Sequence, residues 1–376
     1  MVPILSATLI YQFGRGIIIP ILPLYLFQIL HFSALQIGLG YTALGVGTLV
    51  FEPLWGMLAD ARSKVAVYVV GISTPVSYLS LTFLHSWTAV VVLQFFMGGL
   101  FAGMAVVQRS FVARSTDPPK RSGALGVLGS AVSGSVMVGS LTGGVLDVIF
   151  GARAPFYFGC ILAFLSLFPL AASGGAPRTG KGQGKEQMKW NSQWGQFVLL
   201  GIVAMTAFMG ETIYMSLIGV VMTQPPFFGS AIDVSIMVAI FNFSRMIFQP
   251  VIGSLGATRA RLWVAIGLLL GIFAFIPLIE AKQLLIVYAS SFVEGLAFSS
   301  ISPLSMSMFV GLTANAYAGT AIGIYGAAED IGVLMGPLTF GLFWAAYGIP
   351  AACMSISAVY ATVLVLYVAG TRKRGG

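Results

Sequence analysis

Apolar residues occur in twelve long runs along the chain, and short polar or glycine-rich segments separate these runs. A helix that crosses a bilayer needs about 20 mostly apolar residues. Because lipid cannot satisfy unpaired backbone groups, the runs are predicted to be helices rather than an open sheet. The predicted spans are 3–29, 35–58, 65–84, 88–109, 122–150, 154–172, 195–222, 232–256, 262–280, 284–311, 318–347 and 350–370.

The composition excludes an ordinary soluble domain. Hydrophobic residues make up 58% of the chain and charged residues only 8%, whereas a soluble domain carries about 25% charged residues. Cys160 and Cys353 both lie inside apolar runs and show neither a disulfide framework nor a zinc-binding spacing. The predicted fold class is therefore an all-α integral membrane protein with twelve transmembrane helices.

The positive charges are placed asymmetrically. With the first terminus in the cytoplasm, 15 of the 19 lysines and arginines fall in inner connections or the C-terminal tail, and only Arg153 and Lys282 fall in outer loops. This asymmetry is the positive-inside pattern of a multi-pass protein. It predicts that both termini are cytoplasmic, and it explains the net charge of +8 without invoking nucleic acid.

The chain also repeats itself. Residues 173–194 are glycine-rich, charged and without periodicity, which is typical of a linker between an N-terminal bundle (1–172) and a C-terminal bundle (195–376). At a constant offset of 197, residues 51–64 align with 248–261, residues 124–131 with 321–328, and residues 139–144 with 336–341. The repeat predicts two pseudo-symmetric six-helix bundles related by a two-fold axis along the membrane normal.

Several motifs resemble the major facilitator superfamily, most closely its drug:proton antiporter branch. The segment Gly56–Lys64 is similar to the superfamily's signature between the second and third helices, and Gly139–Gly144 is similar to the antiporter motif of the fifth helix, with Ser140 where that motif has proline. One departure is Gln94, where such antiporters commonly carry an arginine. The resemblance implies the major facilitator fold with rocker-switch alternating access.

The same resemblance suggests which residues form gates. Asp60 would hold the inner gate by pairing with Arg62 or with the start of the eleventh helix. Small residues on the fifth helix would let it rock against the eighth helix of the other half, although ordinary close packing is the alternative interpretation. The gating set comprises Gly56, Asp60, Arg62, Gly139, Gly143, Gly144, Gly336 and Pro337.

Seven ionisable residues lie within the predicted spans, and such residues are costly in lipid unless they are paired or hydrated. They are Arg15, Glu52, Glu211, Arg245, Glu294, Glu329 and Asp330. Five acids face two bases, so pairing cannot neutralise all of them. We expect Arg15 and Glu211 to lie at similar depth and to pair across the axis, either for coupling or for structure. We expect Glu294, with Glu211, to be a protonatable coupling site; together with Gln94, these charged residues form the predicted cavity.

The sequence therefore predicts a proton-coupled exporter of small amphipathic compounds. Uptake of a sugar or organic acid on the same fold, and a non-transporting receptor or lipid-handling protein, are the alternatives. No phosphate loop, nucleotide-binding fold or catalytic triad is present in the sequence, so we expect no enzyme activity. The expected partners are a small-molecule substrate, protons and the lipid bilayer of the cell membrane. We expect a monomer without cofactor, bound metal or nucleic acid.

Overall fold

The computed structural model describes residues 2–115, 121–172, 194–253, 257–312 and 318–372. Within these ranges the elements are helices and no strand occurs. The first half contains α1 (Val2–Ile18), α2 (Ile21–Leu24), the π-helix η1 (Tyr25–Ile29), α3 (Ala34–Leu81), α4 (Trp87–Ser115), α5 (Arg121–Phe150), α6 (Ala154–Leu165) and α7 (Leu167–Ala172). The second half contains α8 (Trp194–Met215), α9 (Leu217–Met222), α10 (Ala231–Gly253), α11 (Ala257–Phe275), the 3-10 helix η3 (Ile276–Ile279), α12 (Leu284–Gly311), α13 (Ala318–Tyr347) and α14 (Ile349–Arg372).

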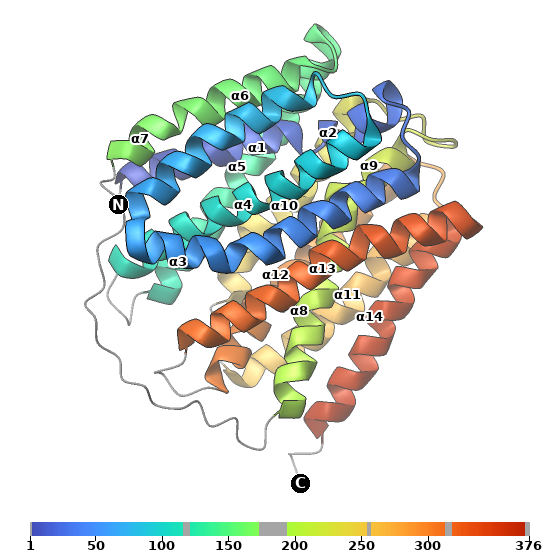
Figure 1. Cartoon of the computed structure of the whole chain (residues 1–376). Coiled ribbons are helices and arrows are strands. Elements are labelled where there is room, and N and C mark those ends of the chain that lie inside the picture. The colour runs from blue at the N-terminus through green and yellow to red at the C-terminus, as the bar shows by residue number, and fades with distance from the viewer. Residues whose placement is uncertain (1, 116–120, 173–193, 254–256, 313–317, 373–376) are drawn as a thin grey trace.

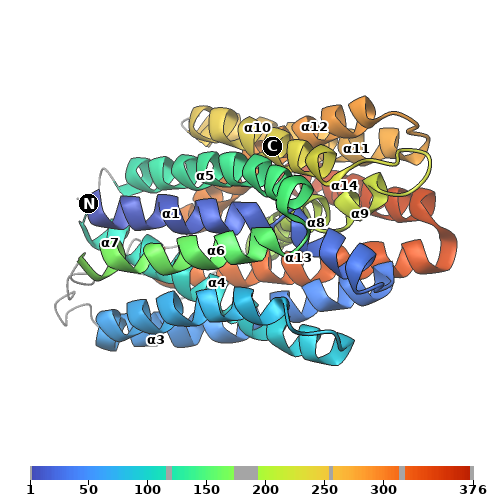
Figure 2. The same cartoon turned by 90° about the horizontal axis from the view of Figure 1, so that it is seen from above.

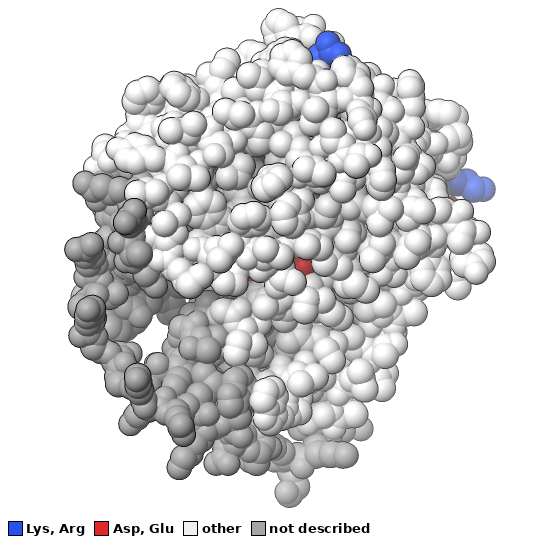
Figure 3. Space-filling model, in the orientation of Figure 1, with Lys and Arg blue, Asp and Glu red and all other residues white. Residues whose placement is uncertain are grey.

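The described helices fit a membrane environment. Ten segments are long and apolar enough to cross a bilayer, and two shorter apolar helices, Tyr68–Leu81 and Ala154–Pro169, complete the twelve predicted spans. Large apolar side chains such as Phe83, Phe150 and Leu285 are exposed to at least two thirds of their surface. Among the described residues on the face shown in Figure 3, charged residues are almost absent, and the few Lys and Arg lie at the rim. A surface of this kind faces lipid rather than water.

The second and third spans differ from the prediction in one respect. The sequence predicts a loop between residues 58 and 65, whereas helical backbone continues from Ala34 to Leu81 in α3. This helix still reverses direction. Trp55 and Val70 both pack against Gly103 of α4, where either side chain would clash with an added Cβ atom. In a straight helix those two residues would lie about 22 Å apart. The two arms of α3 lie side by side in Figures 1 and 2, so both spans exist and the predicted loop is wrong.

The internal repeat is visible in equivalent contacts. Gly151 and Gly348 are 197 residues apart, and each directly follows the end of a helix, α5 or α13, with a positive φ of 87° or 85°, a backbone conformation that favours glycine. A Cβ at Gly98 would meet the Leu44 carbonyl, and a Cβ at Gly295 would meet the Phe241 carbonyl. Both contacts join the fourth helix of a half to its second helix, so the repeat holds in three dimensions.

Aromatic pairs repeat in the same way. Phe51 and Phe95 contact each other edge to face with ring centroids 5.5 Å apart. Their equivalents, Phe248 and Phe292, do so at 6.0 Å. The two halves are therefore pseudo-symmetric six-helix bundles built on the same packing.

The register of the first helix differs by one residue between the halves. The break after α1 falls at Pro20, and the break after α8 falls at Ser216, which is 196 residues later. Likewise, a Cβ at Gly139 would meet the Phe13 carbonyl, whereas a Cβ at Gly336 would meet the Met209 carbonyl. The loop that follows this helix is thus one residue longer in the second half, and the offset returns to 197 from α10 onward.

The halves meet along two helix pairs, α5 with α10 and α3 with α13. At one end the backbones almost touch, because a Cβ at Gly38 would lie 2.6 Å from the Pro337 carbonyl oxygen. Near the opposite end the approach is looser: a Cβ at Gly326 would lie 3.8 Å from the nearest Glu52 oxygen. A continuous cluster of buried apolar side chains includes residues of both halves. The two bundles therefore pack more closely at the Gly38–Pro337 end than at the Glu52–Gly326 end.

Candidate functional site

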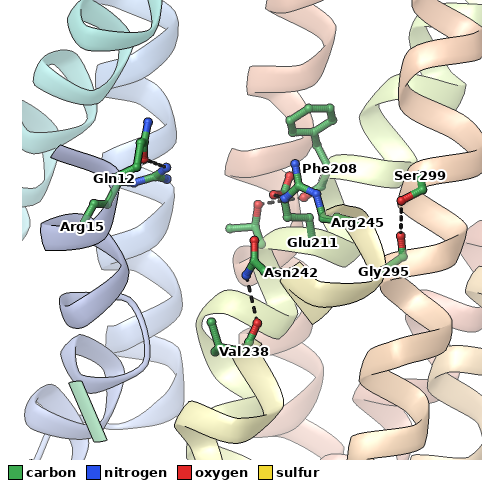
Figure 4. A network of polar contacts seen from close by, with 10 residues as sticks. Gln12, Arg15, Phe208, Glu211, Val238, Asn242, Arg245, Gly295 and Ser299 are labelled. Carbon is green, nitrogen blue, oxygen red and sulfur yellow. Dashed lines mark hydrogen bonds and ion pairs between the residues drawn. The ribbon is translucent and has the colours of Figure 1, made fainter. Parts of the chain in front are cut away.

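Glu211 and Arg245 form an ion pair between α8 and α10 (Figure 4). The side chains are mostly buried, with 18% of Glu211 and 16% of Arg245 exposed. The Arg245 guanidinium also stacks over Phe298 of α12, 4.1 Å from the ring centroid. Three elements of the second half therefore meet at this pair, and Glu211 is neutralised by Arg245 rather than by the predicted Arg15.

Arg15 lies in a comparable setting in the first half. Its guanidinium lies 5.0 Å from the ring centroid of Phe101 on α4, and Nη1 donates a 3.4 Å hydrogen bond to the Gln12 side-chain oxygen (Figure 4). No carboxylate of the described residues lies within salt-bridge distance of this arginine. The predicted pairing of Arg15 with Glu211 is thus wrong, and the reason is that α10 supplies a closer base from within the same half.

Glu294 of α12 is completely buried. One of its carboxylate oxygens accepts a 2.7 Å hydrogen bond from the Tyr360 hydroxyl of α14. The other oxygen has no hydrogen-bond partner among the residues that the structure describes. A Cβ at Gly210 of α8 would meet both the carboxylate and the hydroxyl. Glycine at that position is what lets an acid and a tyrosine fit beside α8.

Glu211 follows Gly210 directly, so the two acids lie close to the same stretch of α8. They are near enough to repel each other electrostatically when both are ionised. Glu211 has an arginine partner and Glu294 has only a neutral hydroxyl. The arrangement therefore combines a fixed ion pair with a buried acid that can gain or lose a proton without breaking a salt bridge.

The remaining predicted cavity acids lie elsewhere. Glu52 lies opposite Gly326 on α13, at the looser end of the interface. Glu329 and Asp330 are buried on α13 itself, with 7% and 6% of their surface exposed.

Comparison with known proteins decides the family. The family model described as Major Facilitator Superfamily matches residues 4–222 and 200–375, which is nearly the whole chain. The chain belongs to the major facilitator superfamily. Its fold and its class as a multi-pass membrane transporter follow from that membership.

Individual superfamily members are similar over their full length. The chain is 23% identical to the staphyloferrin B transporter of Staphylococcus aureus, covering 94% of this chain and 88% of that protein. It is 24% identical to the quinolone resistance protein NorA of the same organism, covering 94% and 92%. The crystal structure of the nucleoside transporter NupG superimposes with a TM-score of 0.75 at 15% identity, covering 100% of this chain and 99% of that chain. At that identity the last match supports the fold alone.

The glycines of the fifth helix, α5, face two different helices. Gly139 and Gly143 face α1 of their own half, where a Cβ would meet the Phe13 and Ile17 carbonyls. Gly144 faces α10, where a Cβ would lie 2.5 Å from the Ser235 hydroxyl. Adjacent helix positions point about 100° apart, which places Gly143 and Gly144 against different helices here. The prediction that this glycine face packs on the eighth span is therefore wrong for Gly139 and Gly143, while Gly144 does contact α10.

Gly336 and Pro337 on α13 likewise contact different helices. Gly336 packs against the Met209 backbone of its own half, whereas the Pro337 carbonyl meets Gly38 of the other half. At Gly56, Asp60 and Arg62 only the helical backbone of α3 is described. The gating role predicted for those three residues therefore lies outside the described side chains and stays a prediction.

Gln94 is buried against Gly40, and neither of its amide atoms has a hydrogen-bond partner among the described residues. Its repeat equivalent is Ser291, whose hydroxyl donates a 2.8 Å hydrogen bond to the Met237 carbonyl. Because residues 40 and 237 are also equivalent, this position of the fourth helix contacts the second helix at the same place in each half, by packing in the first half and by a hydrogen bond in the second. Gln94 is thus positioned inside the first bundle, against α3.

Sequence reasoning missed Tyr360. A tyrosine in an apolar run indicates a core residue or an interfacial anchor, and no local pattern links residue 360 to residue 294. The repeat did carry a signal, because the equivalents of Glu294 and Tyr360 at an offset of 197 are Met97 and Ala163. Two polar groups appear together in one half at positions that are apolar in the other, which marks a pair.

Proposed function

We propose that this major facilitator transporter is a proton-coupled exporter of small amphipathic compounds, with Glu294 as its proton site. The observation that carries the proposal is the setting of Glu294: complete burial, one hydrogen bond from Tyr360 and a second oxygen without a partner. A buried group of this kind changes its free energy greatly on ionisation, which suits a group that binds and releases protons.

The coupling would act through the contact between α8 and α12. Ionised Glu294 repels Glu211 across Gly210, and protonation removes that repulsion. Arg245 holds Glu211 in place throughout. A ligand can shift a conformational equilibrium only by its differential affinity for the two states. Proton binding at Glu294 would therefore favour the state in which α8 and α12 pack most closely.

The geometry of the interface favours alternating access. The halves are in backbone contact at Gly38 and Pro337, and the approach is looser at Glu52 and Gly326. A rocking motion would exchange the tight and the loose end while leaving each bundle intact. The positive-inside pattern supports cytoplasmic termini and a cell-membrane location, and the similar NorA and staphyloferrin B transporter favour export.

The test uses purified protein in proteoliposomes with an imposed pH gradient and a fluorescent quinolone as the probe. Glu294→Gln should abolish accumulation driven by the gradient while quinolone exchange without a gradient continues. The matched control is Glu280→Gln, which makes the same change at an exposed acid between η3 and α12. Gradient-driven accumulation in Glu294→Gln equal to that of the wild type would falsify the assignment of Glu294.

A further inference from the structure

Arg15 is a positive charge without a counter-ion among the described residues. It lies on α1 within the first apolar span, Leu5–Ile29. Its contacts are the Phe101 ring and the Gln12 side-chain oxygen, both uncharged. Its Nε atom is buried and has no hydrogen-bond partner among the described residues. A guanidinium offers five N–H donors in a planar fork, so most of its donors remain available to a further ligand.

The second half shows what a neutralised version of this arrangement looks like. Phe101 and Phe298 are repeat equivalents, and each carries a guanidinium over its ring. Over Phe298 the arginine is Arg245, and Glu211 balances its charge. Over Phe101 the arginine is Arg15, and no carboxylate of the described residues lies within salt-bridge distance of it. The first half therefore holds one unbalanced positive charge where the second half holds an ion pair.

The repeat also explains why no acid is available. With the offset of 196 that applies to the first helix, Arg15 occupies the position of Glu211. Met97 stands where the second half has Glu294, and Thr48 stands where it has Arg245. Each position that supplies an acid near the centre of the second half thus supplies a neutral or basic residue in the first half.

The groups around Arg15 suit an anion. Tyr11, Tyr41 and Tyr78 lie close enough to interact electrostatically with it. Phenol hydroxyls donate hydrogen bonds, as does the amide nitrogen of Gln12. The ring of Phe101 offers an apolar surface beside the charge. A small anion with an apolar body would therefore find donors and an aromatic contact at one place.

We propose that Arg15 binds the carboxylate of the transported compound, which makes the substrate class a small organic anion with an apolar body. This inference rests on the proposed transport function and deepens it. Arginine binds carboxylates through two parallel N–H···O hydrogen bonds, which a lysine cannot reproduce. Binding of an anion would supply the counter-charge that Arg15 lacks. Arg245 would not bind the substrate carboxylate in this way, because Glu211 already balances its charge.

The test measures binding without any gradient, so that it does not depend on proton coupling. Purified protein in neutral detergent is titrated with 1-naphthoate and with its uncharged analogue 1-naphthamide, and the thermal unfolding temperature reports binding. The wild type should bind naphthoate at least about tenfold more tightly than naphthamide, in line with hydrogen bonds to a charged group. Arg15→Gln should lose that preference, and Arg15→Lys should keep part of it.

Two controls and the outcomes complete the design. Arg153→Gln removes an arginine from an exposed outer position and should leave the preference unchanged. Inorganic phosphate should not stabilise the protein as naphthoate does, because it lacks the apolar body. Equal binding of naphthoate and naphthamide by the wild type, or an undiminished preference in Arg15→Gln, would overturn the inference. If the wild type prefers naphthoate but Glu294→Gln leaves the gradient-driven flux unchanged, only the proton-coupling proposal is overturned.

Discussion

Arg15 and Glu211 occupy the same position in the two repeats, yet each contacts a different partner and they do not pair with each other. The offset of 196 along the first helix of each half places them in equivalent sites. Glu211 is held by Arg245, and Arg15 stacks on Phe101. One position of an ancestral six-helix unit thus carries opposite charges in its two copies, which makes the centre of the molecule electrically asymmetric.

The Glu211–Arg245 pair should contribute to stability. Arg245→Leu should lower the free energy of unfolding by about 2 kcal/mol, between the values for buried and for exposed pairs, because both side chains are partly exposed. The double variant Glu211→Gln/Arg245→Gln should recover more than half of the loss, since it leaves no uncompensated charge. Thermal unfolding in detergent measures both effects. A double variant less stable than Arg245→Leu would contradict the explanation.

Glu294 should be dispensable for folding. Glu294→Met introduces the residue found at the equivalent position of the other half, Met97. Replacing a buried acid by an apolar side chain of similar volume is often neutral or stabilising, so this variant should unfold at the wild-type temperature or above. Proton-driven transport should nevertheless be lost. If Glu294→Met unfolds well below the wild type, Glu294 has a structural role.

Tyr360→Phe, in contrast to Glu294→Met, should lower the stability of the protein. Removal of the hydroxyl leaves the buried Glu294 carboxylate without a hydrogen bond among the described residues, at a cost of roughly 1.5–3 kcal/mol. The unfolding temperature should therefore fall, whereas Tyr347→Phe, at a side chain that is 75% exposed, should leave it unchanged. In a Glu294→Met background the Tyr360→Phe effect should shrink. An equal effect in both backgrounds would show that Tyr360 acts independently of Glu294.

The tight end of the interface should not tolerate larger side chains. A Cβ at Gly38 would lie 2.6 Å from the Pro337 carbonyl oxygen, and overpacking of this kind costs about 1–3 kcal/mol. Gly38→Leu should therefore slow transport by hindering closure at this end while the protein still inserts in the membrane. Gly311→Leu, at a position with no neighbour within 4 Å, is the control. Transport rates of the two variants in proteoliposomes distinguish the cases, and equal rates would argue against a gate at Gly38.

The two glycines with positive φ should be equally sensitive. Gly151 and Gly348 have φ values of 87° and 85°, and neither has a neighbour that would clash with a Cβ. The cost of Gly→Ala should therefore come from backbone conformation alone, at about 1–2 kcal/mol for each. Thermal unfolding of the two single variants should show matching decreases. A clear difference between them would mean that the two sites are not structurally equivalent.

The gating role that the motif suggests for Asp60 stays a prediction that transport measurements can test. If Asp60 is a gate residue, Asp60→Ala should reduce transport several-fold while expression and the unfolding temperature stay close to those of the wild type. Asp233→Ala is not a suitable comparison, since Asp233 accepts a hydrogen bond from Tyr288. Glu280→Ala, at an exposed acid between η3 and α12, is the matched control. Unchanged transport in Asp60→Ala would contradict the gating role.

Much of the fold could be predicted because membrane helices leave local signals. The length and apolarity of each run identify a span without reference to any other part of the chain. The repeated blocks revealed two equivalent halves, since duplicated packing retains the same small and aromatic residues, such as Gly98 and Gly295. The reversal between the second and third spans was also predictable, although its helical backbone was not, because charged residues in Gly56–Lys64 are compatible with a loop or a helix end.

The pairings in the site could not be predicted in this way. Which acid meets which base depends on how each helix is rotated about its axis and on how far neighbouring helices are displaced along their axes. A loop one residue longer in the second half changes that register, and it places Arg15 level with Glu211 rather than with Thr212.

The sequence by itself therefore determined the number of spans, the duplication and the excess of buried acids over bases, because these follow from composition and spacing. Only the tertiary structure decided that Arg245 neutralises Glu211, that Tyr360 reaches Glu294 and that Arg15 has no acidic partner among the described residues. The physical reason is that an ion pair or hydrogen bond requires atoms to approach within about 3–4 Å. Helix packing, rather than the order of residues along one helix, sets such distances.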